Sequence, residues 1–322
     1  MIIVAVEDHR RAILVRLSAM FIENGFKVSD PFLQGLVTFD LLARRDREKY
    51  VIKILYNIDT LRGDNSMELL AISKFMDSSP VVVGERSSGG LLEDDLVYFR
   101  HGVPIMSEET LKDYVEGQKP FIFSGPGGYY VSIDGKKMRE IMDQRGYSIG
   151  YISSKVGISR RSVSFYENGS AATIDIFFKL EALLSGEIRR EIDVSEYAAR
   201  YNPPAENIPE QDAFRTAIIS LMKSAGYDIT LLKKTAFDAM ALDAVKSLVF
   251  MGFLDMLENA SNKIQTIKKS SEFMEDEALL VSRKIVDRDN IMGCPVTNIN
   301  ELRSFCERGE LVELIERKKN AR

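Results

Sequence analysis

The chain has 322 residues, of which 45% are hydrophobic and 28% are charged, and its formal net charge at pH 7 is −5. This length is sufficient for two or three domains, and the composition is typical of a soluble globular protein. No apolar run approaches the roughly 18 residues of a membrane-spanning helix, and the N-terminus lacks the basic region and cleavage site of an export signal. We therefore expect a cytoplasmic protein with no membrane partner.

Few residues are suited to metal or thiol chemistry. The cysteines are Cys294 and Cys306, and the histidines are His9 and His101. The cysteines do not have the C-x-x-C spacing of a zinc site, and two thiols suit a reducing compartment better than a disulfide framework. The sequence therefore predicts two buried, unreactive cysteines, no bound metal and no cofactor.

The first third of the chain predicts an α/β domain, which we assign to residues 1–117. An amphipathic helix at residues 11–24 precedes two strand-like runs, a helix, the short apolar strand "PVVVGER" and a closing helix.

A hairpin-like run in this domain, "TFDLLARRDREKYVIKI", contains Asp40 and, further on, Lys53. The run resembles the Asp…(Asp/Glu)-x-Lys layout of restriction-endonuclease-like and Holliday-junction-resolvase-like nucleases, in which two carboxylates hold Mg²⁺ and the lysine positions water. Val51 stands where the second carboxylate is needed. Asp40 and Lys53 are therefore interpreted as degenerate remnants without catalytic activity. An active nuclease would need a substitute acid, and the candidates are Glu7, Asp59 and Glu68.

Two segments separate this domain from the rest. The sequence "KPFIFSGPGGYYVSIDG" alternates polar and apolar residues around a Gly-Pro-Gly-Gly turn, so residues 118–133 are predicted to be a linking β-hairpin. It lacks the Lys-Ser/Thr of a phosphate loop. The Pro-rich polar sequence "YNPPAENIPEQD" predicts a second linker at residues 196–210.

Positive charge is concentrated between the two linkers, although the whole chain is acidic. Seven basic residues between Lys136 and Arg161 are opposed by two acidic ones, Glu140 and Asp143. The seven are Lys136, Lys137, Arg139, Arg145, Lys155, Arg160 and Arg161. Such segregation directs a positive field from one module toward phosphates.

The sequence of this module, residues 134–195, predicts a helix-turn-helix. Asp134, Ser148 and Ser159 are suited to cap three successive helices. A small residue, Ser153, is available where two helices cross, and Gly157 permits a left-handed turn. Five apolar residues are spaced to set the angle between the helices. They are Ile152, Val156, Ile158, Val163 and Tyr166.

The helix after this turn has two different faces. At about 100° per residue, Val163 and Tyr166 point toward the core while Arg161 and Phe165 point away. An arginine can span O6 and N7 of guanine, and an apolar ring can contact a thymine methyl group. The alternative is an ordinary solvated helix face. We predict that four residues read DNA bases: Arg160, Arg161, Ser164 and Phe165.

A second group of polar residues surrounds this helix, and we predict that it contacts phosphates. The group consists of Arg145, Ser148, Lys155, Lys136, Lys137 and Ser159. Each of them is also suited to an ordinary surface position.

The last third repeats the pattern of the first. Gly226-Tyr227 corresponds to Gly25-Phe26, and Phe237-Asp238 corresponds to Phe39-Asp40. A helix at residues 213–225 is again followed by strand-like runs, a helix, a strand ("ALLVSRK") and a helix. We predict an internal duplication of residues ~5–117 and ~211–317. In the second copy, the thirteen-residue spacing places Val249 and Met251 at the positions of the acid and the lysine. The alternative is a chance likeness between two α/β domains.

The string "SIGYISSKVGISRRSVSFYENG" resembles the Cro/repressor-type (XRE-like) helix-turn-helix. Together with the lead-in "GGYYVSIDGKKMREI" and the flanking α/β domains, it resembles a group of archaeal HTH-type transcriptional regulators, which implies DNA binding and transcriptional control. The predicted fold is α/β plus all-α, with two related restriction-endonuclease-like α/β domains flanking a central helix-turn-helix bundle. The second α/β domain is assigned to residues 211–322.

The predicted function is that of a non-enzymatic, sequence-specific transcription factor that binds double-stranded DNA. We expect a homodimer, since one such module reads one half-site, and an unidentified small-molecule effector is compatible with the sequence. One alternative is a structure-specific, metal-dependent nuclease that docks through its helix-turn-helix. The other is a non-enzymatic adaptor that binds protein or RNA.

Overall fold

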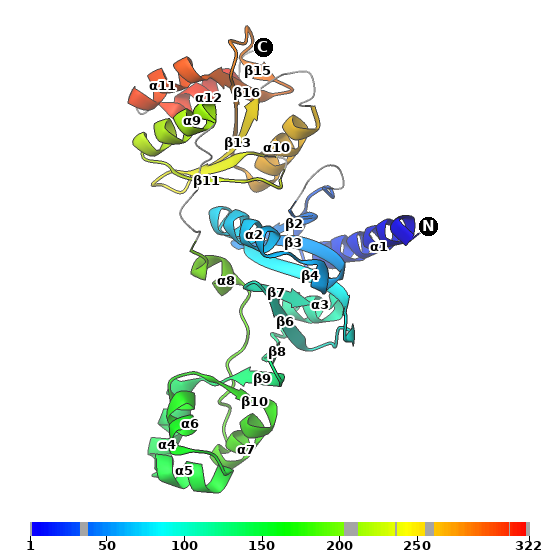
Figure 1. The fold of residues 1–322 in the computed structure, drawn as a ribbon, viewed down its shortest axis with the longest axis vertical. Helices are drawn as coiled ribbons and strands as arrows, with labels where there is room; N and C mark the ends of the chain where they lie inside the picture. Colours follow the sequence, from blue (N-terminus) through cyan, green and yellow to red (C-terminus); the bar gives the residue numbers. More distant parts are fainter. Residues whose placement is uncertain are drawn as a thin grey trace. The chain divides into compact units, whose positions relative to one another are not determined.

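The structure is a computed structural model, which describes residues 2–32, 38–202, 212–235, 237–254, 261–308 and 310–319, without the side chains of residues 2–8, 307 and 308. The chain divides into two compact units, and Figure 1 labels its helices and strands. Unit 1 consists of Met1–Asn24, Ile54–Leu61 and Val81–Val194, and unit 2 of Gly25–Lys53, Arg62–Pro80 and Ser195–Arg322. Within the described ranges, no helix combines the length and the apolarity that crossing a membrane requires.

Among the described residues, ten strands form one sheet in the order β1-β2-β3-β4-β7-β6-β8-β9-β10, with β5 paired to β4. The first seven are β1 (Lys27–Val28), β2 (Leu41–Arg45), β3 (Glu48–Asn57), β4 (Ser79–Ser87), β5 (Gly90–Leu91), β6 (Leu96–Arg100) and β7 (Val103–Met106). β2 and β3 form an antiparallel hairpin, whereas β4 and β7 are parallel. The continuous apolar run of β4, Val81–Val83, is typical of a strand that is buried on both faces.

The helices of this α/β segment are α1 (Ile2–Glu23), α2 (Gly63–Phe75) and α3 (Glu108–Val115), with a 3₁₀ turn, η1, at Ile58–Thr60. α1 begins nine residues earlier than the predicted helix at residues 11–24. Gly25 follows it with φ +80°, a left-handed conformation that glycine adopts without steric cost. Ser107 caps α3 by accepting a hydrogen bond from the Thr110 N–H at 3.1 Å.

The central part of unit 1 contains the predicted hairpin and the predicted helices. They are β8 (Ile122–Gly125), β9 (Gly128–Ser132), α4 (Gly135–Arg145), α5 (Ile149–Val156), α6 (Arg160–Glu167), β10 (Ala171–Thr173) and α7 (Ile174–Leu184). The β8–β9 hairpin packs against the helices of this central part. Val131 of β9 pairs with Ala172 of β10, and Val131 and Ile133 belong to the same buried cluster as the helices. The hairpin is therefore part of the helical domain's core.

Unit 2 contains the C-terminal α/β segment. Its strands are β11 (Asp228–Leu231), β12 (Ala239–Leu242), β13 (Leu248–Leu254), β14 (Glu277–Ser282), β15 (Asn290–Ile291) and β16 (Cys294–Asn298). Its helices are α9 (Ala213–Ser224), α10 (Ser261–Met274), α11 (Ile299–Arg308) and α12 (Leu311–Lys319). The sheet order is β11-β12-β13-β14-β16-β15, and both Cys294 and Cys306 are buried, as predicted.

The predicted linker at residues 196–210 begins differently from the expectation. A short helix, α8 (Ser195–Arg200), is followed by Tyr201, whose carbonyl oxygen accepts a hydrogen bond from Lys74 Nζ at 2.8 Å. Contacts with α2 therefore hold the start of this segment. Residues 203–211 lie outside the described part of the chain.

Candidate nucleic-acid interface

The turn between α5 and α6 has the geometry that the sequence predicts. Gly157 ends α5 with φ +78°, and Ser159 begins α6 by accepting the Ser162 N–H at 3.0 Å. Ser153 donates its hydroxyl to the Ile158 carbonyl at 2.6 Å. The small side chain therefore also satisfies a backbone carbonyl of the turn, which a bulkier apolar residue would leave unbonded.

The other predicted caps are also confirmed. Asp134 accepts the Lys137 N–H at 3.1 Å at the start of α4, and Ser148 accepts the Tyr151 N–H at 3.1 Å at the start of α5. Gly146 ends α4 with φ +65°. These local hydrogen bonds set where each helix begins and ends.

The two faces of α6 separate as the helical periodicity predicts. Val163 is fully buried, and Tyr166 packs against the same apolar cluster. On the other face Arg161 is exposed, and 48% of Phe165 is accessible to solvent. The Arg161 guanidinium lies 5.2 Å from the centre of the Phe165 ring, a cation–π contact. α6 thus presents a cation and an aromatic ring side by side.

The two remaining predicted base-reading residues differ from this pair. Arg160 is exposed and extends along α5, since its guanidinium nitrogen is 3.3 Å from the position that a Cβ on Gly150 would occupy. Ser164 is half-buried, and its carbonyl accepts the Asn168 side-chain amide at 2.8 Å. Arg160 therefore lies at the margin between α5 and α6.

The predicted phosphate-contacting residues are all exposed. They are Lys136, Lys137, Arg145, Ser148, Lys155 and Ser159. Within the described ranges, the four basic ones and Arg160 and Arg161 form no ion pair. Ser148 and Ser159 lie at the N-termini of α5 and α6, where unpaired backbone N–H groups and the helix dipole attract anions.

One residue beside this surface is not singled out by the sequence pattern. Tyr151 of α5 is 38% exposed, its ring centre is 4.5 Å from that of Tyr147, and Lys155 Nζ is 5.7 Å from its ring centre. Lys155 stands four residues after Tyr151 on α5, a spacing that would have indicated a shared helix face. Tyr151 thus adds an aromatic hydroxyl to the exposed basic surface.

The nuclease-like remnants in unit 2 form a buried ion pair. The Asp40 carboxylate has no solvent exposure, and Lys53 Nζ is 3.2 Å from its Oδ1. Val51 is fully buried at the position of the missing acid. Mg²⁺ needs a near-octahedral shell of oxygens at about 2.0–2.1 Å. One carboxylate held by an ammonium group does not fit that requirement, so these residues do not form a magnesium site.

The substitute acids have other partners. Glu68 is 8% exposed and accepts the backbone N–H groups of Lys233 and Lys234 at 2.6 and 2.9 Å. Burial raises the pKa of Glu68, while these N–H donors act in the opposite direction. Asp59 is exposed, and the Ser88 N–H and Arg100 lower its pKa. The side chain of Glu7 lies outside the described residues.

In the C-terminal segment, the residue equivalent to Asp40 is Asp238, and its carboxylate has two cationic partners. Asp238 accepts the Phe253 N–H at 2.6 Å and forms ion pairs with Arg215 and Lys263. Because the Asp40 N–H bonds to the Ile52 carbonyl and the Asp238 N–H bonds to the Met251 carbonyl, Met251 corresponds to Ile52. The residue that corresponds to Lys53 is therefore Gly252. The assignment of Met251 from the thirteen-residue spacing was wrong by one residue, because the β12–β13 connection is longer than the β2–β3 turn.

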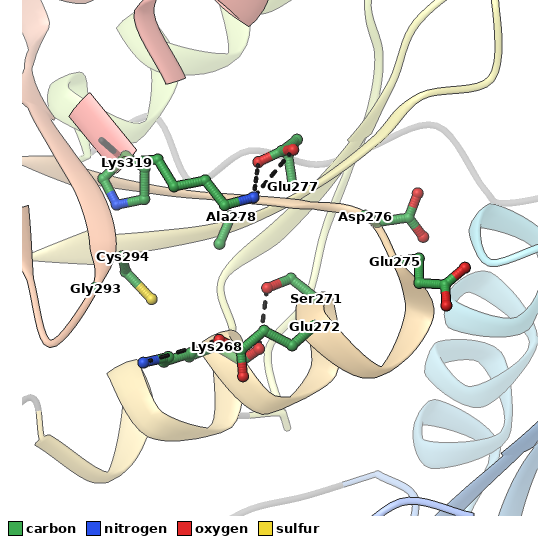
Figure 2. A pocket seen from close by; sticks show the side chains of 11 residues that line it. Lys268, Ser271, Glu272, Glu275, Asp276, Glu277, Ala278, Gly293, Cys294 and Lys319 are labelled. Atoms are coloured by element: carbon green, nitrogen blue, oxygen red, sulfur yellow. Dashed lines mark hydrogen bonds and ion pairs between the residues drawn. The ribbon is translucent and has the colours of Figure 1, made fainter. Parts of the chain in front are cut away.

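A pocket of about 260 Å³ opens in the C-terminal segment beside α10 and β14 (Figure 2). Several of its polar side chains already have partners: Lys319 pairs with Glu277 at 3.1 Å, Ser271 donates to the Lys268 carbonyl at 3.0 Å, and Glu275 pairs with Arg44 outside the pocket. Burial raises the pKa of Cys294 to about 11, so its thiol stays protonated near neutral pH. The lining offers no reactive thiolate.

The geometry defines a helix-turn-helix protein that also carries a nuclease-like α/β domain, and comparison with known proteins agrees. Residues 138–189 match the helix-turn-helix family, and residues 10–120 match the PD-(D/E)XK superfamily domain. No solved structure matches the chain.

Whole-length relatives carry the name "Putative HTH-type transcriptional regulatory protein". One from Picrophilus torridus is 43% identical over 97% of this chain and 98% of its own length. Another, from Thermoplasma volcanium, is 42% identical over 97% and 99%, and one from Haloquadratum walsbyi is 31% identical over 95% and 96%. The chain belongs to this archaeal family of HTH-type transcriptional regulatory proteins. It is a DNA-binding regulator of the helix-turn-helix class.

Proposed function

We propose that the protein is a cytoplasmic, sequence-specific transcriptional regulator that reads double-stranded DNA with α6. The observation that carries this proposal is the division of α6, which holds Val163 in the core and turns Arg161 and Phe165 toward solvent. A helix of this kind fits the major groove with its N-terminal residues against base edges.

Base reading is assigned to Arg161 and Phe165, together with Arg160 and Ser164. The Arg161 fork suits O6 and N7 of a guanine, and Phe165 suits an adjacent thymine methyl group. Their mutual cation–π contact supports this assignment because it restricts the arginine before DNA binds, which lowers the entropy that binding must remove.

Phosphate contacts are assigned to residues around the same surface: Lys136, Lys137, Arg145, Ser148, Lys155 and Ser159. The absence of ion pairs at the four basic residues, within the described ranges, supports this role. A cation that is not paired with a carboxylate can neutralise a phosphate without first breaking an internal contact. Tyr151 is added to this set, since its exposed hydroxyl can donate to a phosphate oxygen.

The protein acts as a homodimer in this proposal, because one module reads one half-site and two are needed for high affinity. It is not a nuclease, since Asp40 is paired with Lys53 and Val51 replaces the second acid. Regulation by a small-molecule effector is compatible with the proposal, and no residue is assigned to it.

Selection of bound sequences from a random duplex pool tests this function. The expected result is an enriched motif with two half-sites whose centres are about 10 base pairs, or a multiple, apart. Binding to that motif must exceed binding to a scrambled duplex and must weaken steeply with salt. Enrichment of no motif, with equal affinity for every duplex, would exclude a sequence-specific reader.

The PD-(D/E)XK match favours a nuclease as the alternative, and the same preparation tests it. Duplex and branched DNA are incubated with Mg²⁺ or Mn²⁺, and the proposed regulator leaves both intact. Cleavage by the wild type that Asp40→Ala abolishes would establish the nuclease instead.

A further inference from the structure

The two α/β segments share more than an order of elements. In the strand order, β11-β12-β13-β14-β16-β15 repeats β1-β2-β3-β4-β7-β6. Five residues with φ between 48° and 88° in one segment have a counterpart in the same connection of the other. The pairs are Gly25 and Gly226, Asp46 and Lys246, Asp77 and Glu275, His101 and Met292, and Gly102 and Gly293. Because non-glycine residues adopt this conformation rarely, the agreement indicates a common backbone plan.

Within unit 2, equivalent residues of the two segments touch each other. Phe39 and Phe237 precede the equivalent residues Asp40 and Asp238. Their ring centres are 6.3 Å apart, and neither ring is exposed. A contact between two equivalent positions is what a two-fold axis passing between them produces.

The contacts on either side of this pair are reciprocal. On one side α2 meets the β11–β12 connection, where Glu68 accepts the N–H groups of Lys233 and Lys234, and Asp64 pairs with Lys234. On the other side α10 meets the β1–β2 connection, where Lys269 Nζ lies 2.9 Å from Asp30. Each segment thus offers the same helix to the same connection of the other.

We propose that the C-terminal α/β segment is a second copy of the N-terminal fold and pairs with it inside one chain as a pseudo-two-fold dimer. The second copy then occupies the surface that a separate protein subunit would otherwise cover. The pairing also closes the neighbourhood of the nuclease-like remnant, because Thr38 and Phe39, directly before Asp40, contact Lys234 and Phe237.

Opposite charges connect the two copies. At the α2 and α10 contacts the N-terminal copy supplies the acids, Asp64 and Asp30, and the C-terminal copy supplies the bases, Lys234 and Lys269. At β2 the sense is reversed, because Arg44 of the N-terminal copy pairs with Glu275 of the C-terminal copy. Charge complementarity of this kind fixes how two surfaces align with each other.

Zero-length carbodiimide cross-linking of the full-length protein tests the pairing. The expected products join Lys234 to Asp64 and Lys269 to Asp30. The Lys319–Glu277 pair, 3.1 Å apart within one copy, is the matched control. If the control link forms and both inter-copy links are missing, the pairing is wrong.

Mixing equal amounts of ¹⁴N- and ¹⁵N-labelled protein before cross-linking distinguishes one chain from two. Pairing inside one chain gives linked peptides that are entirely light or entirely heavy. Linked peptides that combine one light and one heavy partner in about half of the product would show that the copies pair between chains, which overturns the proposal.

A tryptophan reporter provides a second measurement, since the chain contains no tryptophan. Phe237→Trp places the reporter at the contact with Phe39, and Val245→Trp places the control at a residue that is 84% exposed. The expected acrylamide quenching constant is at least threefold lower at position 237. The charge-reversed variant Lys234→Asp should raise quenching at position 237, and adding Asp64→Lys should lower it again. Equal quenching at positions 237 and 245 in folded protein would contradict a closed contact.

Discussion

The basic residues of the helix-turn-helix and those of unit 2 are used in different ways. On α4 to α6, exposed cations such as Arg145, Lys155 and Arg161 have no carboxylate partner within the described ranges. In unit 2, many cations are paired with carboxylates. Examples are Arg44 with Glu275, Lys234 with Asp64, Lys263 with Asp238, Lys269 with Asp30 and Lys318 with both Asp289 and Glu301. Available cations, rather than net charge, therefore mark the proposed DNA-binding surface of this acidic protein.

The largest effect on stability is expected at the Asp40–Lys53 ion pair of unit 2, if this pair stabilises the fold. Asp40→Ala leaves the Lys53 ammonium group without its buried partner, so we expect a loss of about 3 kcal/mol in the free energy of unfolding. Urea denaturation measures it. The double variant Asp40→Ala/Lys53→Met is the control, and it should recover much of the loss. Wild-type stability in the single variant would show that the pair is not structural.

The available cations should instead affect DNA binding and leave stability unchanged. Arg161→Ala is expected to weaken binding to the selected motif by about 2 kcal/mol and to relax the preference at one base pair. Fluorescence anisotropy on matched and mutated duplexes measures both effects. Lys179→Ala, at an exposed position on α7, is the matched control. An equal loss on every duplex would remove Arg161 from the base-reading set.

Asp276 of unit 2 is a partly buried carboxylate. Burial raises its pKa from 3.8 to about 6. A carboxyl group with a raised folded-state pKa contributes most below its unfolded pKa, and this contribution is lost as the pH rises through about 6. Asp276→Asn removes that loss and keeps an acceptor for the Leu248 N–H. After allowance for solvent screening, we expect the free energy of unfolding of this variant to exceed that of the wild type by about 1 kcal/mol at pH 7.

Unfolding curves at several pH values check this prediction. The gain should fall by about half between pH 7 and pH 5, because Asp276 becomes protonated in the folded wild type. Glu272→Gln, at an exposed carboxylate on α10, is the control. A gain that does not depend on pH would mean that ionisation of Asp276 is not its source.

The smallest effect is expected at Lys155. Lys155→Ala should weaken binding to matched and scrambled duplexes equally and by less than about 1 kcal/mol. The slope of log K against log salt should fall by about 1, because one phosphate contact is lost. Salt titrations measure it. A base-dependent loss would instead place Lys155 among the residues that read sequence.

The helix-turn-helix was predictable because its determinants are local. The caps at Asp134, Ser148 and Ser159 and the left-handed Gly157 act within one or two turns of chain, and a 3.6-residue period separates Val163 from Arg161. Tyr151 was not singled out, although Lys155 four residues later shares its helix face.

Long-range details were less predictable. The counterpart of Lys53 was misplaced by one residue because a strand register depends on hairpin length, which spacing alone does not reveal. The structured start of the linker was also missed, since α8 and Tyr201 are held by α2, which is more than 100 residues earlier in the chain.

The helix-turn-helix module could be derived from the amino-acid sequence, because capping and helix periodicity are encoded in neighbouring residues. It also determined the loss of the second acid, since Val51 occupies that position in any arrangement. Which charges are neutralised depends on the folded arrangement of the chain. Asp30 and Lys269, or Asp64 and Lys234, are far apart in sequence, and folding alone brings them close enough for electrostatic attraction to act.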